Sequence, residues 1–208
     1  MYYRIISLII LVLLSFFKTP IFANPVDQLT QLLGSFSTYQ AQFKQWTVND
    51  QHQIQAQSTG QFAIQRPNKF RWQTAAPANE LIIANGNTLW HYDAALMQAT
   101  EQTLQPGTQT ENPAMLLSAK VHDLAVNFAV STVTFQGHQW FKLIPKKNAN
   151  YQAIYLYFLH HQLTKIMVIN NIGERSLFQF FDIKLNQPLP SAIFTFKPPK
   201  GVDVDVQH

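Results

Sequence analysis

Arg66 is the basic side chain whose position most strongly suggests a chemical role. From Ile54 to Ile64 the small and apolar residues occupy alternate positions, and Arg66 continues that alternation directly before Pro67. A guanidinium on an apolar face is unfavourable unless it is hydrogen-bonded. The residues alone leave two outcomes open. Either the strand ends at Ile64 and Arg66 turns into solvent, the commoner fate of an arginine, or its guanidinium donates to backbone carbonyls of a segment that covers the sheet.

The other reactive side chains form no catalytic or metal-ligating group in the sequence. The chain has seven histidines and no cysteine, which excludes a thiol nucleophile, a cysteine zinc site, an iron–sulfur cluster and a disulfide scaffold. His160 and His161 are neighbours and would face opposite ways on a strand, and the remaining histidines show no ligand spacing. Residues 174–176 fit a polar turn, and no nucleophile-elbow, Walker or Rossmann motif is present. We therefore expect no catalytic residue, no metal and no cofactor, and a protein that is not an enzyme.

A short basic cluster is interleaved with aromatic residues, where Arg66, Lys69 and Arg71 alternate with Phe70 and Trp72. It could contact acidic lipid headgroups or a partner, but a solvated strand face explains it as well, and the pattern alone favours that interpretation. The formal net charge is only +4, and a nucleic-acid-binding protein would show a dense basic stripe. We expect no nucleic-acid partner.

The N-terminus has the features of a cleavable signal peptide. Arg4 precedes the largely apolar stretch 5–17, which is shorter than the roughly 20 residues of a membrane span but typical of a signal-peptide core. Cleavage after Ala23 would leave one domain, residues 24–208, with 13 basic and 11 acidic residues; an uncleaved anchor is the alternative. Because no cysteine could carry a lipid anchor, we expect an exported monomer that is free in solution.

The remaining chain predicts one helix, many strands and a short second helix. Asn24-Pro25 is typical of a helix start, and apolar residues then recur at helical spacing to Phe36. Alternation of period two indicates roughly ten or eleven strands, the last at Ile193–Phe196, with a short helix at 114–119. The result would be an antiparallel sheet, curved or closed, with an apolar concave face. Helices packed tightly on that face would give an ordinary core; packed loosely, they would leave a cavity for an apolar ligand.

The composition fits such a sheet. Charged residues make up 12% of the chain, hydrophobic residues 47% and aromatic residues 13%, whereas an ordinary domain is about 25% charged. The chain has 23 glutamines, and many occupy the outward positions of the expected strands. They keep the surface polar without charge.

Four segments carry a resemblance to a known family. Residues Arg66–Trp72, Leu81–Tyr92, Asn112–Leu117 and Phe194–Val202 resemble, in order and spacing, the outer-membrane lipoprotein carrier protein (LolA) family, along nearly the whole mature chain. The related outer-membrane acceptor (LolB) is a lipoprotein with an N-terminal cysteine, and the absence of cysteine here favours the soluble carrier.

The resemblance implies a mainly β (α+β) fold and a transport function. The fold would be an incomplete antiparallel β-barrel of about eleven strands, with an N-terminal helix and short lid helices over a hydrophobic cavity. The protein would be a periplasmic carrier that takes the acyl chains of lipoproteins released from the inner membrane by an ABC transporter. It would deliver them to a LolB-like outer-membrane acceptor. A periplasmic binding module for another apolar ligand is the main alternative, and a hydrolase using the pocket is a weaker one.

The resemblance also implies roles for particular residues. Arg66 would hold the lid shut through hydrogen bonds to its backbone, Phe70 would lie at the cavity mouth, and Trp72 would form part of the wall. Ala114 begins the lid helix, where family members can carry a bulky aromatic residue, so the tightness of the closed state is in question. The candidate ligand-binding residues are Arg66, Phe70, Trp72, Leu81, Ile83, Trp90, Ala114, Met115 and Leu116.

Overall fold

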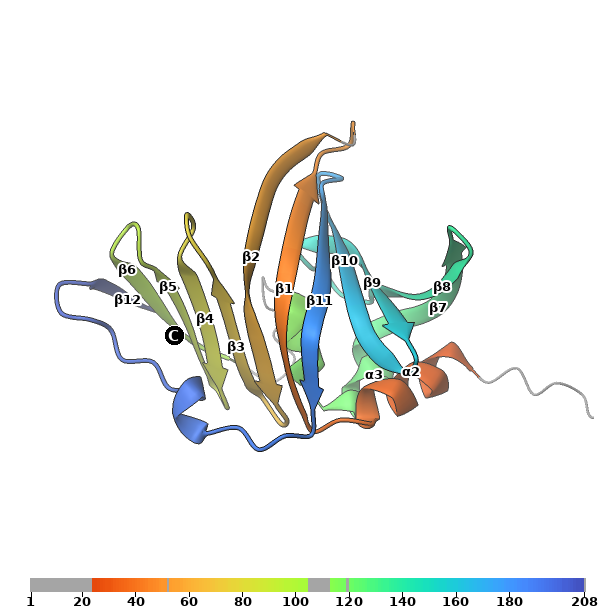
Figure 1. The fold of residues 1–208 in the computed structure, drawn as a ribbon, viewed down its shortest axis with the longest axis horizontal. Coiled ribbons are helices and arrows are strands. Elements are labelled where there is room, and N and C mark those ends of the chain that lie inside the picture. Colours follow the sequence, from red (N-terminus) through yellow and green to blue (C-terminus); the bar gives the residue numbers. More distant parts are fainter. Residues whose placement is uncertain (1–23, 52, 105–112, 119, 208) are drawn as a thin grey trace, which may run out of the picture.

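One strongly curved β-sheet organises the molecule (Figure 1). The computed structural model describes residues 24–51, 53–104, 113–118 and 120–207; the predicted signal peptide and Asn112 lie outside these ranges. Within them the sheet has twelve strands: β1 (Thr38–Val48), β2 (Ile54–Gln65), β3 (Lys69–Thr74), β4 (Glu80–Asn85), β5 (Thr88–Asp93), β6 (Gln98–Thr103), β7 (Phe128–Phe135), β8 (His138–Pro145), β9 (Tyr151–Leu159), β10 (Gln162–Asn170), β11 (Arg175–Leu185) and β12 (Asp203–Gln207).

The strand order confirms the incomplete barrel. The sheet runs β12-β6-β5-β4-β3-β2-β1-β11-β10-β9-β8-β7, so that β12 and β7 are its two open edges. Neighbouring strands are antiparallel except β12, which pairs in parallel with β6. That strand was not predicted, and the antiparallel expectation is wrong at this edge.

The C-terminal segment also differs from the prediction. Residues Ile193–Phe196, expected to form a strand, instead lie at the short 3-10 helix η4 (Ser191–Phe194) and directly after it. Prolines at 188, 190, 198 and 199 flank this segment. Proline has no N–H to donate to a strand ladder, and this explains why the segment crosses the sheet as a helical turn and does not extend it.

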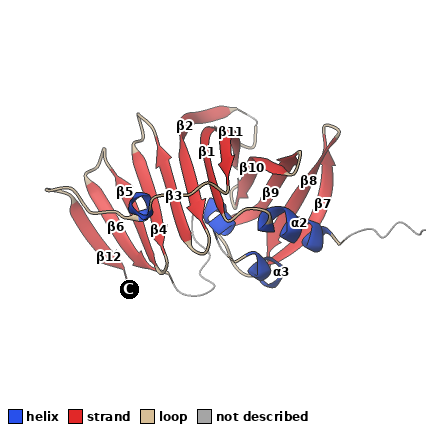
Figure 2. Cartoon of the chain, turned by 60° about the horizontal axis from the view of Figure 1, so that its bottom comes forward, coloured by secondary structure: helices blue, strands red, loops and turns tan. Residues whose placement is uncertain are grey.

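The predicted N-terminal helix is confirmed as α2 (Pro25–Gly34). The Asn24 side chain accepts a hydrogen bond of 3.1 Å from the Val26 N–H, while Leu29 and Leu33 face the core. The predicted middle helix is the 3-10 helix η2 (Pro113–Ser118), followed by η3 (Val121–Asp123) and α3 (Leu124–Asn127). Figure 2 shows α2 and α3 beside the strands of the β7 end of the sheet.

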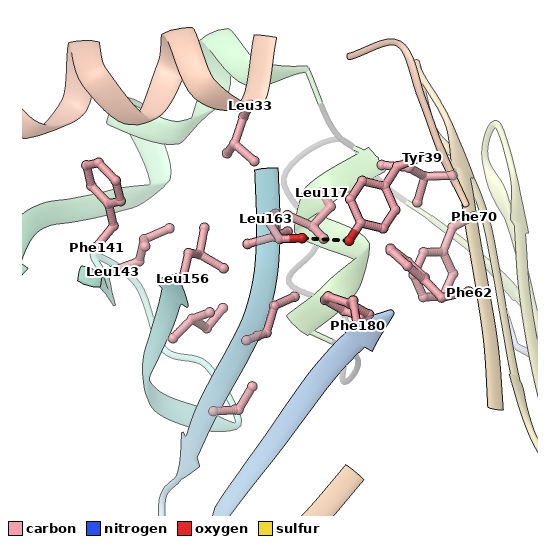
Figure 3. Close-up of a cluster of buried hydrophobic side chains, with 14 of the residues drawn as sticks. Leu33, Tyr39, Phe62, Phe70, Leu117, Phe141, Leu143, Leu156, Leu163 and Phe180 are labelled. Atoms are coloured by element: carbon pink, nitrogen blue, oxygen red, sulfur yellow. Dashed lines mark hydrogen bonds between the residues drawn. The ribbon is translucent and has the colours of Figure 1, made fainter. Parts of the chain in front are cut away.

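The sheet has an inner face, which α2 and η2 cover, and an outer face. Side chains from both halves of the sheet meet on the inner face (Figure 3). Tyr39 lies at the centre, where its hydroxyl donates to the Leu163 carbonyl at 2.7 Å, and burial raises the pKa of Tyr39 well above its usual range. The largest buried residues of this inner core include Tyr39, Phe43, Phe62, Phe70, Leu33, Leu117, Leu143 and Ile154.

The long strand β2 departs from its predicted burial. The alternation from Ile54 to Ile64 predicted one covered face along the whole strand. Phe62 and Ile64 are buried, but Ile54 is 58% exposed. In Figure 1 the ends of β1, β2 and β11 extend well beyond the helices. The residue alternation therefore predicted burial along the whole of β2, whereas the helices cover only the part of the strand near its C-terminal end.

Candidate functional site

Arg66 lies directly after β2, at the start of the turn into β3. Its N–H donates to the Ser37 carbonyl at 2.9 Å, which fixes the backbone beside β1. The strand ends at Gln65, close to where the solvent-exposed alternative placed its end. The side chain nevertheless adopts the other arrangement, because its guanidinium points to backbone carbonyls of the segments that cover the inner face.

The guanidinium connects two covering segments. Its Nε donates to the Leu117 carbonyl of η2 at 2.9 Å, and one terminal nitrogen donates to the Phe36 carbonyl at 2.6 Å and to the Leu33 carbonyl. Leu33 and Phe36 lie in the last turn of α2 and just beyond it, where carbonyls without helical partners carry partial negative charge. A single side chain therefore joins the end of β2 to both α2 and η2.

The charge of Arg66 is stabilised by dipoles and a ring. The guanidinium carbon lies 4.3 Å from the centre of the Phe36 ring, a cation–π arrangement. Burial lowers the pKa of Arg66 to about 10, so the side chain is still a cation at neutral pH. Hydrogen bonds from a charged donor are stronger than neutral ones, and here they are directed at carbonyls that belong to separate segments.

The η2 segment has a second tie to the same turn. The Asn68 N–H donates to the Ser118 carbonyl at 2.9 Å. Leu117 is 1% exposed and belongs to the inner core, while Leu116 is half-buried against it. Leu117 was not predicted as a site residue. Its apolar side chain lay within the motif Asn112–Leu117, but nothing in a sequence marks a backbone carbonyl as an arginine acceptor.

The predicted aromatic residues of β3 lie beneath this cover. Phe70 is fully buried, and Trp72 is 4% exposed. The Trp72 ring stacks on Phe43 with centroids 4.0 Å apart, and Phe62 contacts both Phe70 and Trp72 edge-on. Arg66, Phe70 and Trp72 are therefore brought together, in a closed and packed arrangement. Ala114 and Met115 belong to η2, and their side chains lie outside what the structure describes.

Leu81, Ile83 and Trp90 lie on the outer face. Directly paired residues share a face of a sheet, and Ile83 pairs with Arg71 and with Trp90, while Phe70 pairs with Ala84. The structure does not bring these three residues together with Phe70 and Trp72, although the prediction grouped all five in one site. Every residue from Leu81 to Ala84 is apolar, so alternation could not assign their faces. Ligand binding by Leu81, Ile83 and Trp90 stays a prediction.

The C-terminal segment covers this outer surface. The Phe196 ring lies 5.3 Å from Trp90 and 5.2 Å from Tyr92, and Phe194 is fully buried. Arg71 donates to the Ile193 carbonyl at 3.1 Å. The sequence pattern favoured a solvated strand face for the basic cluster, but at Arg71 the C-terminal segment partly covers that face. Burial lowers the pKa of Arg71 as well.

Among residues 24–51, 53–104, 113–118 and 120–207, no three histidine, aspartate or glutamate residues gather in a way that could hold a metal ion. In the same part of the chain, no helix is both long and apolar enough to cross a membrane. The site is an aromatic inner face beneath α2 and η2, and the Arg66 guanidinium is hydrogen-bonded to both of these segments.

Comparison with known proteins gives consistent results. Residues 34–197 match the family model of "Outer membrane lipoprotein carrier protein LolA". An outer-membrane lipoprotein carrier protein of Coxiella burnetii is 47% identical over 184 residues, covering 88% of this chain and 87% of that protein. One from Azotobacter vinelandii is 33% identical over 97% of this chain and 98% of its own length. A crystal structure of a LolA superfamily protein from Nitrosomonas europaea covers 84% of this chain and 99% of its own, with a TM-score of 0.51 at 14% identity; it supports the fold.

Proposed function

The chain belongs to the LolA family of outer-membrane lipoprotein carrier proteins, and we propose that it carries lipoproteins by holding their acyl chains against the inner face of its sheet. The observation that supports this most directly is the attachment of both α2 and η2 by Arg66. A carrier needs an apolar surface that can be uncovered and covered again. Ties made by side-chain hydrogen bonds can be broken without disturbing the sheet ladder.

The energies suit reversible binding. Each buried CH₂ of an acyl chain contributes about 0.8 kcal/mol, so a lipoprotein gains a large stabilisation from the apolar face. Hydrogen bonds to a charged group contribute about 1.5–3 kcal/mol each, which is enough to favour the closed state without making it permanent. We propose that the acyl chains contact Phe70 and Trp72 of β3 once η2 moves away from them. On η2 itself, the chains would contact Ala114, Met115 and Leu116.

The proposal includes a compartment and partners. Residues 1–23 have the features of a signal peptide, and we propose export to the periplasm. The sequence has no nucleotide-binding motif, so the energy for loading would come from an inner-membrane ABC transporter, and unloading would go to a LolB-like acceptor.

Incubation with spheroplasts tests the carrier function. Added protein should move outer-membrane-directed lipoproteins into the soluble fraction, and native mass spectrometry of the purified protein should show a triacylated protein bound to it. Recovery of a small lipid alone would favour the alternative of a general apolar binding module. If no lipoprotein enters the soluble fraction, the carrier proposal is wrong.

Arg66→Leu should separate loading from delivery. Without the guanidinium the empty, closed state loses stability relative to the loaded state, because a ligand shifts a conformational equilibrium by its differential affinity. We expect normal loading, with transfer to the acceptor reduced about tenfold or more. Arg71→Leu, which changes an arginine that bonds on the outer face, is the matched control and should transfer normally. Delivery at the normal rate by Arg66→Leu would contradict the proposed role.

A further inference from the structure

Four polar side chains form a continuous hydrogen-bonded row across three neighbouring strands. The Ser58 hydroxyl donates to Gln45 Oε1 at 3.1 Å, and Gln45 Nε2 donates to Thr47 Oγ1 at 3.4 Å. Thr47 Oγ1 and Ser176 Oγ lie 3.2 Å apart. All four side chains are half-buried. We call Gln45, Thr47, Ser58 and Ser176 the polar row.

The polar row belongs to the inner face. Gln45 pairs with Ser58 on β2 and with Phe178 on β11. Two residues earlier on β1, Phe43 pairs with Phe180, which is part of the inner core. Because paired residues and residues two apart share a face, the row continues the same surface that carries the aromatic core.

Three aromatic rings mark the boundary between the core and the row. Phe43 stacks on Trp72, and the Phe178 ring lies 5.1 Å from Trp72. Gly60, which pairs with Phe43, makes this possible: a Cβ at Gly60 would lie 2.5 Å from the Phe43 ring and 2.1 Å from the Gln73 carbonyl. The rings therefore lie close against the backbone, and the polar side chains begin at the next inner positions.

The row lies at the end of the sheet away from Arg66. Thr47 is next to the last residue of β1, and Ser176 is the second residue of β11, where the strands extend past the helices (Figure 1). The inner face thus has a direction, from the end covered by α2 and η2, through the aromatic rings, to an end with amide and hydroxyl groups that no helix of the described residues covers.

This direction matches an amphipathic ligand. Polar groups on an apolar, half-buried face are unfavourable unless they are hydrogen-bonded, and an inner face for hydrocarbon alone would need none. The row has two donors to spare: the second N–H of the Gln45 amide, and whichever O–H of Thr47 and Ser176 is not used in the bond between them. Ester and amide carbonyls accept such bonds and adjoin the acyl chains of a lipid-modified cysteine.

We propose that the polar row binds the ester and amide carbonyls at the head of an acylated glyceryl-cysteine, with the acyl chains running from the row toward α2 and η2. This inference rests on the proposed carrier function and adds the orientation of the cargo to it. The chains would pass over Phe43 and Phe178, and the peptide part of the cargo would leave the protein between the β1–β2 and β10–β11 turns.

A pair of synthetic ligands tests the proposal. One is a short peptide with a tripalmitoylated glyceryl-cysteine at its N-terminus, and the other carries the same chains through ether links in place of the esters. The wild type should bind the ester ligand more tightly. In the double variant Gln45→Leu, Thr47→Val, the preference for the ester ligand should fall about threefold to tenfold for each hydrogen bond lost, while affinity for the ether ligand, which keeps only the amide carbonyl, should fall less.

The control lies on the same strand. Gln42→Leu removes a glutamine of the outer face, whose Nε2 donates to Asp182 at 2.9 Å, and it should leave the ester preference intact. Thr47→Val alone, which keeps the shape of the side chain, guards against misfolding of the double variant, and thermal unfolding checks all variants. If the wild type binds neither ligand, the carrier function and the orientation both fail. If it binds both ligands and the row variants keep the same ester preference, the orientation alone is wrong.

Discussion

Arg66 and Arg71 lie five positions apart and attach covers to opposite faces of the sheet. Arg66 donates to the Leu117 carbonyl of η2 on the inner face, and Arg71 donates to the Ile193 carbonyl of η4 on the outer face. In both cases an arginine, directly after β2 or within β3, binds the backbone of a 3-10 helix that is distant in sequence. The two covers nevertheless differ in what else holds them.

The outer cover is continuous with the sheet. After η4 the chain places Phe196 on the β5 aromatic residues and then pairs as β12 with β6 over five residues. Phe194 of η4 is completely buried. The inner cover η2 also has a buried side chain, Leu117, but none of residues 113–118 pairs with a strand. Hydrogen bonds from the Arg66 side chain and the Asn68 amide tie it to the turn after β2. We therefore expect the outer cover to stay attached as a permanent part of the fold and the inner cover to be the one that detaches.

Phe194→Ala should have the largest effect on stability. Removing a fully buried phenylalanine lowers the free energy of unfolding by about 3–5 kcal/mol, and urea denaturation would measure it. Ile172→Ala, at a side chain that is 83% exposed, is the control and should change stability by less than about 0.5 kcal/mol. A small effect of Phe194→Ala would mean that the outer cover is as weakly held as the inner one.

Arg66→Leu should loosen the inner cover alone. The Asn68 amide is hydrogen-bonded to Ser118 of η2, so its hydrogen exchange reports detachment of this segment. We expect that exchange to rise about tenfold or more, with little change at Thr195, whose amide bonds to Ala192 within the η4 turn. Faster exchange at both amides would show that the two covers open together.

Arg71→Leu should have the smallest of these effects. It removes one hydrogen bond of 3.1 Å to η4, while Phe194 and β12 still hold the segment. Exchange of the Thr195 amide should rise by no more than about threefold, and that of Asn68 should not change. A tenfold rise at Thr195 would place Arg71 on a par with Arg66 and remove the distinction between the covers.

Much of this architecture was predictable from the sequence, because it depends on local patterns. Asn24-Pro25 and the helical spacing after it predicted α2, and the dipeptide Asn85-Gly86, which favours a hairpin turn, lies at the turn between β4 and β5. Residue alternation also indicated the aromatic face of β3, which has polar residues at the positions between.

The faces of β4 and β5 could not be predicted in the same way. The sheet is covered on both sides there, so Ile83 and Ala84 are both buried and the two-residue period disappears. Sequence pattern also could not identify the acceptors of Arg66, because they are main-chain carbonyls that lie 30 to 51 positions away. The residues alone left both outcomes open for Arg66, and the family resemblance favoured the bonds to a lid.

The open edge formed by β12 has a consequence for the protein in bulk solution. An unpaired strand edge is a template on which another copy can add, and charged side chains discourage such growth. β12 carries Asp203 and Asp205 at alternate positions, so a second β12 laid alongside it would bring like charges together. The β12 edge therefore disfavours edge-to-edge pairing between copies of the protein, and with it growth into fibrils.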